Sequence, residues 1–271
     1  MQLALDDCQR WRAGRDSYRP AGEPIDPRCY GVEVVREADA KAFVVANHYS
    51  GSFPAARLCV GLFRAQAFRP AEMVGVAVFS VPMQGAAIPA HTGVGSGEGV
   101  ELGRFVLLDD VPGNGETWML ARAFKALRRE KPGVRAVLAY SDPVPRERAD
   151  GTLVKPGHVG TIYQAFNARY CGRGRSEKLI LDARGRVVSR RAMSKLRNGE
   201  SGQNYAYRQL LDAGAPERMP HEDADHYLRR ALGCGAFREM RHPGNHVYTW
   251  RLDGARASLG LPYPKQAQPW A

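Results

Sequence analysis

A buried strand, a glycine-bearing turn, a helix and a second strand follow one another in the middle of this 271-residue chain. Val100–Leu108 is almost continuously apolar, which is typical of a strand buried on both faces. Val134–Tyr140 is a second short apolar run. Between them, an apolar stripe at helical spacing predicts a helix over 116–129. A helix between two strands packs on the sheet, so the chain is expected to adopt an α/β or α+β fold around a mixed sheet.

Other hydrophobic patterns extend this sheet on both sides. Alternating or β-branched runs predict strands over 32–35, 58–63, 73–81 and 246–252, and a hairpin over 177–190. Helical spacing predicts helices over 37–47, 192–198, 203–213 and 222–232. In the first of these helices, the apolar face is expected to consist of Ala38, Ala42, Val45 and Ala46.

The chain is expected to divide into four parts. Residues 1–30 are polar and rich in Arg, Pro and Gly, which predicts an irregular arm. Residues 31–190 form the predicted catalytic core, and 191–245 a basic helical insertion. Residues 246–271 supply a last core strand and an irregular tail.

The stretch Gly157–Asn167 carries polar groups where a purely structural helix would carry apolar ones. Read as one helix, it buries Val159, Ile162 and Phe166 and aligns Tyr163, Asn167 and Tyr170 on the neighbouring flank. Just upstream, a strand ends in Tyr140–Asp142. Polar side chains at the carboxyl end of a strand, beside such a helix, are typical of an α/β binding site. An ordinary half-exposed helix is an equally good interpretation from these residues alone.

Arg104 interrupts the apolar run of its strand. A guanidinium does not deprotonate to escape burial, so it needs a carboxylate, carbonyl groups or a bound anion. Glu101 lies three positions earlier, and this odd spacing predicts that the two side chains point to opposite faces. A buried ion pair and a role in a site are both open for Arg104.

The turn before the second predicted helix contains Gly113, Asn114 and Gly115. Asn114 is a suitable N-cap, and Glu116 suits the positive end of the helix. A glycine-rich turn between a buried strand and a helix N-terminus is an arrangement that binds anions. Many turns of this kind carry glycine without binding anything, so the signal is weak.

Positive charge is concentrated in one segment. The whole chain has 39 Lys and Arg against 28 Asp and Glu, a net charge of +11. Between Arg169 and Arg197, ten basic residues accompany two acidic ones, which is eight of the eleven net charges. A one-sided run favours phosphate contact over a merely solvated face, and nucleic acid is the first candidate partner. The residues assigned to nucleic-acid binding are Arg173, Arg175, Arg190, Arg191, Lys195 and Arg197.

Composition excludes several other classes of protein. The five cysteines are scattered and form no Cys-x-x-Cys pair, so neither a disulfide framework nor a paired-cysteine zinc site is expected. No run is long and apolar enough for a membrane span, and no secretory pattern is present, so a cytoplasmic protein is expected. His221 and His226 lack the spacing of a helical metal pair, and no metal ligands are assigned. An iron or other metal bound by His48 with distant carboxylates stays open.

The order of predicted elements resembles the GNAT (Gcn5-related N-acetyltransferase) fold. In that fold, a strand–loop–helix unit grips an acyl-CoA pyrophosphate, and the next strand splays away to admit the acyl arm. The resemblance implies acetyl-CoA or another acyl or aminoacyl donor, bound at Gly113, Asn114 and Gly115. The usual Gln/Arg-x-x-Gly-x-Gly/Ala loop has no clear match in this turn.

Five short motifs resemble, in this order, the Mom family of bacteriophage proteins. They are Asn47–Gly51, Glu101–Phe105, Asn114, Tyr140–Asp142 and Gly157–Asn167. Mom proteins convert adenine in DNA to N6-carbamoylmethyladenine, a hypermodification that protects phage DNA from restriction enzymes. The resemblance covers roughly residues 32–182 and implies a transferase acting on double-stranded DNA in the host cytoplasm.

Under this resemblance, each polar residue of the motifs has an expected role. Asp142 is the candidate base or acceptor for adenine N6, and Tyr163 the candidate acid for the leaving group. Ser141 and Asn167 orient the reactants, while Arg104 anchors a carboxylate or phosphate. Two further residues, His48 and Tyr49, close over a flipped adenine, with Tyr49 stacking on it.

Two other functions stay open from the sequence. One is a GNAT acyltransferase that acts on a protein or small-molecule amine, and the other is a non-enzymatic DNA-binding protein. The donor is also open, because aminoacyl-tRNA-dependent transferases share the GNAT fold and tRNA would suit a chain of charge +11.

Overall fold

The computed structural model describes residues 7–12, 15–20, 24–48, 50–255 and 259–265. Contacts divide the chain into two compact units. The first comprises residues 1–143, 157–174 and 245–271, and the second comprises 144–156 and 175–244. The sequence-based division set the boundary between core and insertion at 190/191, whereas the corresponding boundary between the compact units is at 174/175. Residues 144–156, predicted as part of the core, belong to the second unit.

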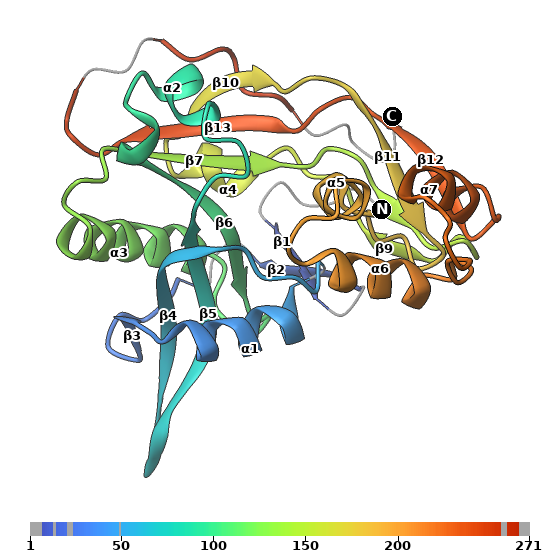
Figure 1. Ribbon diagram of the computed structural model, residues 1–271. Coiled ribbons are helices and arrows are strands. Elements are labelled where there is room, and N and C mark those ends of the chain that lie inside the picture. Colours follow the sequence, from blue (N-terminus) through green and yellow to red (C-terminus); the bar gives the residue numbers. More distant parts are fainter. Residues whose placement is uncertain (1–6, 13–14, 21–23, 49, 256–258, 266–271) are drawn as a thin grey trace. The chain divides into compact units, whose positions relative to one another are not determined.

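Seven strands form the main sheet of the first unit, in the order β10-β13-β7-β6-β5-β4-β3 (Figure 1). Neighbouring strands are antiparallel except for β6 and β7, which are parallel. The mixed sheet and most of the predicted strands are therefore present. Their bounds are β3 (Tyr30–Val34), β4 (Ala56–Gln66), β5 (Arg69–Ser80), β6 (Gly99–Leu107), β7 (Ala136–Ser141), β10 (Arg169–Arg173) and β13 (His246–Arg251).

The parallel strands β6 and β7 separate soon after they begin. They pair only between Gly99–Glu101 and Ala136–Leu138, although β6 continues to Leu107 and β7 to Ser141. Beyond that point β6 is hydrogen-bonded to β5, and β7 to β13. This splay, together with the strand–loop–helix unit before β7, is the arrangement that the GNAT resemblance implies, and the GNAT-like fold prediction is confirmed.

Helices cover both faces of this sheet. One face packs against α3 (Gly115–Glu130) and α4 (Thr161–Ala165), through a core that includes Phe79, Leu120, Phe124 and Trp250. The other face packs against α1 (Glu37–Asn47) and α2 (Ala87–Thr92), which is followed by a short 3₁₀ turn, Ser96–Glu98.

The bounds of α1 agree with its prediction, but the predicted apolar face is wrong. Ala40 and Val44 are fully buried, whereas Ala42 and Ala46 are exposed and Val45 is 48% exposed. Four alanines in a short helix are compatible with several faces, and only packing against β4 and β5 selects one of them.

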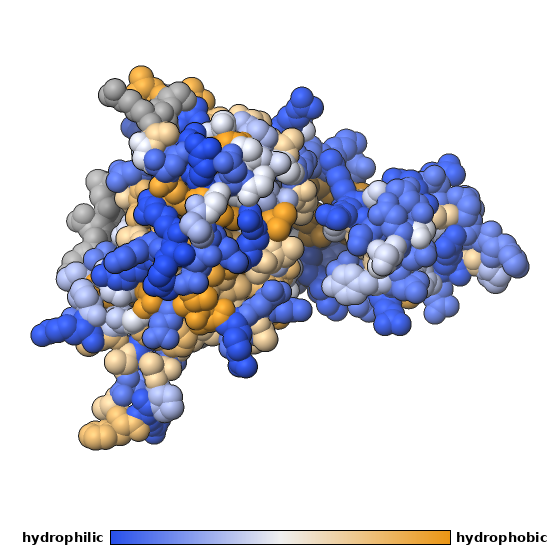
Figure 2. Space-filling view, turned by 60° about the vertical axis from the view of Figure 1, so that its left-hand side comes forward, coloured by the Kyte–Doolittle hydropathy of each residue, from blue (hydrophilic) through white to orange (hydrophobic). Residues whose placement is uncertain are grey.

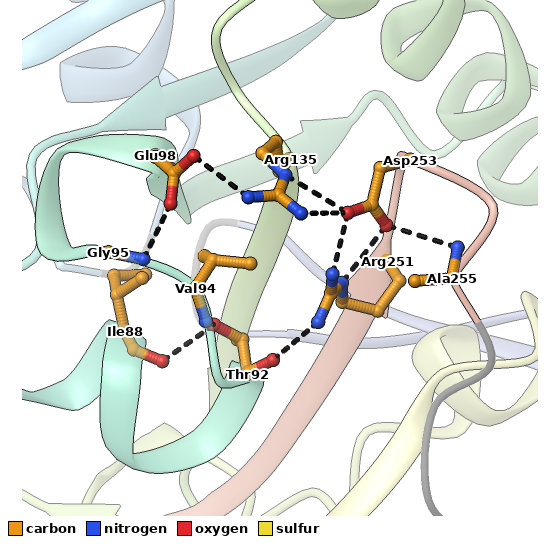
Figure 3. Close-up of polar contacts among 9 residues, drawn as sticks. All are labelled: Ile88, Thr92, Val94, Gly95, Glu98, Arg135, Arg251, Asp253 and Ala255. Carbon is orange, nitrogen blue, oxygen red and sulfur yellow. Dashed lines mark hydrogen bonds and ion pairs between the residues drawn. The ribbon is translucent and has the colours of Figure 1, made fainter.

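An ion-pair network lies where β6 and β7 begin and are still paired, which we call the closed end (Figure 3). The end at which they separate is the splayed end. Arg135, just before β7, binds Glu98 and Asp253 at 3.0 Å each. Arg251, at the end of β13, binds Asp253 at 2.6 Å and donates to the carbonyl of Thr92 at 2.9 Å. These arginines hold the pKa values of both carboxyl groups below their usual range. The network fixes the strands at one end, so that they diverge only at the other.

The β4–β5 hairpin extends beyond its neighbours and projects at the bottom of both views (Figures 1 and 2). Its last pair is Gln66 with Arg69, and Phe68 at the tip is fully exposed, with φ of 59°. Close to this tip, Arg64 binds Glu72 and Asp110 at 2.7 Å each.

The second unit consists of two small two-stranded sheets and three helices. The strands are β8 (Arg146–Glu147), β9 (Leu153–Lys155), β11 (Glu177–Asp182) and β12 (Phe237–His242), and the helices are α5 (Arg190–Arg197), α6 (Gln203–Asp212) and α7 (Ala224–Leu232). The three helices were predicted within a few residues. The predicted 177–190 hairpin forms only next to its turn, at the Leu181–Val187 bridge. Along its whole length, β11 pairs instead with β12.

Two further structural findings concern the sequence predictions. Within the segment expected to be irregular, β1 (Asp7–Arg12) and β2 (Arg15–Pro20) form a hairpin. Among the described residues, none of the helices has the length and apolar character that crossing a bilayer requires.

Candidate active site

Arg104 lies on β6 beyond its last pair with β7 and holds the loop that follows α1. Its Nε donates to the Ser52 carbonyl at 2.9 Å, and its Nη2 donates to Ser52 Oγ at 2.8 Å. Its Nη1 donates to the Gly103 carbonyl at 2.5 Å. The acceptors that the sequence demanded are therefore carbonyl and hydroxyl oxygens, and Arg104 fastens the loop containing His48 to the splayed strand.

His48 is held in one tautomer within this loop. The backbone N–H of Ser50 donates to His48 Nδ1 at 3.1 Å, and Ser50 Oγ lies 2.9 Å from the same nitrogen. Because Nδ1 accepts, the ring hydrogen of neutral His48 is on Nε2. Burial, and then the positive charges of Arg104 and His158, lower the pKa of His48 to about 3. The imidazole is therefore neutral near neutral pH and offers an Nε2–H donor.

A β-bulge changes which face of β6 carries Glu101. Val78 pairs with Arg104 and Phe79 with Leu102, so Gly103 is the extra residue. Because a bulge inserts one extra residue, two residues three positions apart across it point to the same face of the sheet. The prediction that Glu101 and Arg104 point to opposite faces is therefore wrong. A Cβ at Gly103 would overlap Ser80 Oγ, so that hydroxyl would have to move.

Glu101 on β6 and Tyr140 on β7 are half-buried titratable residues that interact electrostatically. Burial raises the pKa of the Glu101 carboxyl, and the positive charge of Arg104 offsets part of this rise. Burial and the negative charge of Glu101 raise the pKa of Tyr140 to about 12. In both groups burial dominates, so the charged forms are disfavoured.

Ser141 and Asp142 are buried at the end of β7, with 1% and 7% exposure. Tyr140 packs with the α2 cluster, so the alternation of a strand turns Ser141 toward the α4 face. Within the described residues, Ser141 Oγ has no hydrogen-bond partner. The carbonyl of Asp142 accepts the backbone N–H of His158 at 2.9 Å, and His158 in turn acts electrostatically on His48.

Gly160 brings Ser141 and Tyr163 together. Its φ is +75°, and a Cβ built there would lie 3.0 Å from both Ser141 Oγ and the Tyr163 ring, and 2.7 Å from the Tyr248 ring. Tyr163 packs against Tyr248 and Trp250, with ring centroids 5.4 and 5.7 Å apart. A side chain at position 160 has no space, so the backbone itself forms this wall of the cluster.

The long polar-flanked helix predicted from 157 to 167 does not form. The helix α4 covers only Thr161–Ala165, and Val159 precedes it. Asn167 follows it in a turn, with φ of 53° and an exposed side chain, and Tyr170 is in β10. Positive φ at Gly160 and Asn167 ends the helix on both sides, so Tyr163 and Asn167 do not share a flank. Ile162 and Phe166 do pack on the main core, as expected.

Sequence reasoning assigned no role to two residues beside Ser141. His246 on β13 pairs directly with Ser141 on β7 and is 2% exposed. The Tyr170 hydroxyl lies 2.8 Å from its Nδ1, and burial and Arg173 lower its pKa. No spacing signal connects residues 141, 170 and 246, since only strand pairing places them together.

The loop before α3 does not fit a conventional pyrophosphate cradle. The Gly115 N–H is bonded to the Pro112 carbonyl at 2.9 Å. Asn114 occupies the N-cap position, but its carboxamide oxygen accepts the Ile25 N–H at 2.6 Å and caps nothing in α3. Residues 109–117 contain three carboxylates, Asp109, Asp110 and Glu116, and neither Lys nor Arg. These negative charges oppose a diphosphate.

The residues assigned to nucleic acid are divided between the two units. Arg173 is exposed on β10, whereas the other five belong to the second unit. Arg190 binds Glu177 at 3.2 Å, and Arg197 binds Asp225 at 2.5 Å. Of the described residues, none forms an ion pair with Arg175 or Arg191.

Two remaining predictions concern Tyr49 and metals. Tyr49 lies outside the described residues. Throughout the described part of the chain, no group of three or more His, Cys, Asp or Glu side chains is arranged to hold a metal ion.

Comparison with known proteins identifies the family. The model of the Mom protein family matches residues 30–220, which is more than half of the chain. The chain belongs to the Mom protein family. All residues predicted as catalytic lie within the matched region. The match ends before β13, the strand that separates β7 from β10 in the sheet of this Mom-family chain.

Other comparisons add less. No curated protein matches the chain. Among solved structures, a tandem GNAT protein from the clavulanic acid biosynthesis pathway, determined without AcCoA, is 10% identical with a TM-score of 0.32. The match covers 71% of this chain and 53% of that protein, so the chain spans about half of its length.

Proposed function

We propose that this Mom-family chain is a DNA-modifying transferase that converts adenine N6 to the N6-carbamoylmethyl form. The observation that carries the proposal is that four of the five family-like motifs meet where β6 and β7 separate. Arg104 holds the His48 loop, and His158 links the end of β7 to His48. Buried groups with shifted pKa values, gathered in one place, are typical of functional sites.

In the proposed reaction, adenine N6 forms a bond to the donor's methylene carbon, which loses its leaving group. The amine also loses one proton. Its lone pair is delocalised into the ring, so it needs a nearby acceptor for that proton and a fixed position. Asp142 is the proposed acceptor, because its carboxylate is buried at the end of β7. Ser141 and Tyr163, which meet around Gly160, are proposed to orient the donor and supply a proton to its leaving group.

The structure supports revised roles for Arg104 and His48. Arg104 makes three hydrogen bonds to the protein, so it is proposed as a positioning residue rather than an anchor for a substrate anion. His48 is neutral and carries its hydrogen on Nε2, which suits it to donate a hydrogen bond to a base or a carbonyl. Asn167 is exposed beyond α4 and is the weakest of the proposed catalytic residues.

The donor is proposed to be an acyl or aminoacyl compound, with tRNA as one carrier. An acetyl-CoA donor is disfavoured by the three carboxylates of the loop before α3. The DNA is proposed to be double-stranded with the target adenine flipped out, because N6 of a stacked, paired adenine does not reach a buried carboxylate.

The test is to coexpress the chain with a plasmid, digest the plasmid to nucleosides and analyse them by mass spectrometry. We expect deoxyadenosine carrying a carbamoylmethyl group in place of one N6 hydrogen. D142A and D142N should abolish the product. D110A is the matched control, since Asp110 is an exposed carboxylate bound to Arg64.

Three results would overturn the proposal. The first is that the plasmid contains only unmodified deoxyadenosine although the protein is soluble and folded. Equal product from wild type and D142N would remove Asp142 from the chemistry. Acetyl transfer to an amine without DNA affinity would favour a GNAT acyltransferase, and DNA binding without any product would favour a binding protein.

A further inference from the structure

Three short helices of the second unit build a small independent core. Leu196 of α5, Leu210 of α6 and Tyr227 of α7 are buried together in it. The turn between α5 and α6 contains Gly199 and Gly202, both at positive φ (64° and 89°). Two helices joined by a short glycine-bearing turn and backed by a third have the element order of a helix-turn-helix motif.

The second helix of this arrangement presents one polar face. Ala206 and Leu210 of α6 are buried, whereas Asn204, Arg208 and Gln209 are exposed on the opposite side. Tyr205 belongs to the same face, is 68% exposed and accepts a hydrogen bond from Gln209 Nε2 at 3.2 Å. No hydrogen bond or ion pair engages Arg208 among the described residues. Its guanidinium is therefore held by a rigid helix with nothing in the unit to bind.

The types of side chain on this face are those that read base edges. Arginine makes paired hydrogen bonds to guanine, and asparagine or glutamine to adenine, in the major groove. A helix of this diameter fits a groove about 12 Å wide. Three such side chains within six positions of one helix match the recognition helix of a helix-turn-helix module.

The charge of the second unit favours the same partner. Seventeen Lys and Arg accompany eleven Asp and Glu, so the smaller unit carries six of the eleven net charges. On the face drawn in Figure 2, hydrophilic residues dominate its surface. Arg191, on the first helix of the module, is exposed and suits a phosphate contact.

We infer that α5 and α6 form a DNA-reading module in which α6 enters the major groove and selects the sequence around the modified adenine. Arg208, Asn204 and Gln209 contact base edges, and Arg191 contacts a phosphate. This inference rests on the proposed function for its substrate, double-stranded DNA, and adds to it the element that determines target sequence.

The first test is a binding selection from randomised DNA duplexes with the full-length chain at fixed salt. We expect wild type to enrich a defined sequence and R208A to lose discrimination at one base pair by roughly tenfold or more. Q209A should relax a neighbouring position. R229A is the matched control, because Arg229 is an exposed arginine on α7, and its selected sequence should equal that of wild type.

The second test separates base reading from phosphate contact. R191A should weaken binding equally for all duplexes and reduce the slope of log affinity against log salt by about 1. Circular dichroism verifies that each exposed variant remains folded.

Failure of the inference is distinguishable from failure of the proposed function. If adenine is modified but R208A selects the same target sequence as wild type, the inference is overturned and the proposed function stands. If the chain selects a DNA sequence but adenine is not modified, the proposed function is overturned and the inference stands. An absence of any selected sequence, or tRNA that outcompetes duplex DNA for α6, would also overturn the inference.

Discussion

The two ends of the β6–β7 pair differ in what shifts the pKa values of their titratable groups. At the closed end, Arg135 and Arg251 surround Glu98 and Asp253, so hydrogen bonds and ion pairs lower the pKa values of both carboxyl groups. At the splayed end, burial is the largest influence on Glu101, Tyr140 and His48, and it disfavours the charged form of each. Charged forms are therefore stabilised by their partners at the closed end, whereas neutral forms are favoured by burial at the splayed end.

The largest effect is expected for Arg104 at the splayed end. R104A removes the hydrogen bonds to Ser52, which releases the His48 loop, and we expect adenine modification to fall by about 100-fold or more. Hydrogen exchange should show lost amide protection in residues 50–54, independently of activity. R57A is the control, since Arg57 also donates to backbone carbonyls, those of Gly97 in the 3₁₀ turn and Gly99 at the start of β6. Unchanged exchange in R104A would contradict the positioning role.

Gly160 tests how tightly the splayed end is packed. G160A adds a methyl group against Tyr248, Ser141 and Tyr163 at a φ of +75°, and we expect a loss of stability of about 2–4 kcal/mol. At the closed end, Gly93 has a similar φ of +72° but open space around it. G93A should therefore show only the backbone penalty, about 1 kcal/mol. Equal losses in thermal or chemical unfolding would mean that the packing around Gly160 contributes nothing.

Asp253 tests the closed end through pH. Its folded-state pKa lies below the unfolded value, so its stabilisation is present above the unfolded pKa of about 4 and is lost as pH falls through the folded pKa. D253N should lower the melting temperature at pH 7, and the difference from wild type should shrink below about pH 4. A difference that does not depend on pH would show that packing, rather than charge, makes the contribution.

The smallest effect concerns the titration of His48. With a folded-state pKa of about 3, its ring should show no titration between pH 5 and 8 in NMR spectra. Between about pH 3 and 6.5, His48 is protonated in the unfolded chain but neutral in the folded one. The free energy of unfolding therefore increases with pH in that window. R104A should raise the His48 pKa. If wild-type His48 titrates near pH 6.5, burial does not lower its pKa as described for the splayed end.

Regular elements with a strong pattern were predicted well from the sequence. The strand Gly99–Leu107 and the helix Gly115–Glu130 have apolar periodicities long enough to decide their type. Local exceptions were not predicted. The bulge at Gly103 reversed the expected face of Glu101, and positive φ at Gly160 and Asn167 shortened α4 to five residues.

The candidate site was predicted in part. The motif residues His48, Arg104, Ser141 and Asp142 were named in advance, but their partners were not. Ser52 lies 52 positions before Arg104, and His246 lies 105 positions after Ser141. Contacts over such distances leave no periodicity in the sequence, so neither partner was found.

By itself, the sequence determined the α/β class, the family and the excess of positive charge, since each depends on composition, local periodicity or motif order. Only the tertiary structure decided that β6 and β7 part after three pairs, that Arg104 binds the loop after α1, and that the basic residues are divided between two units. These features depend on strand pairing and on backbone conformation at single residues, which bring together side chains that local sequence patterns do not connect.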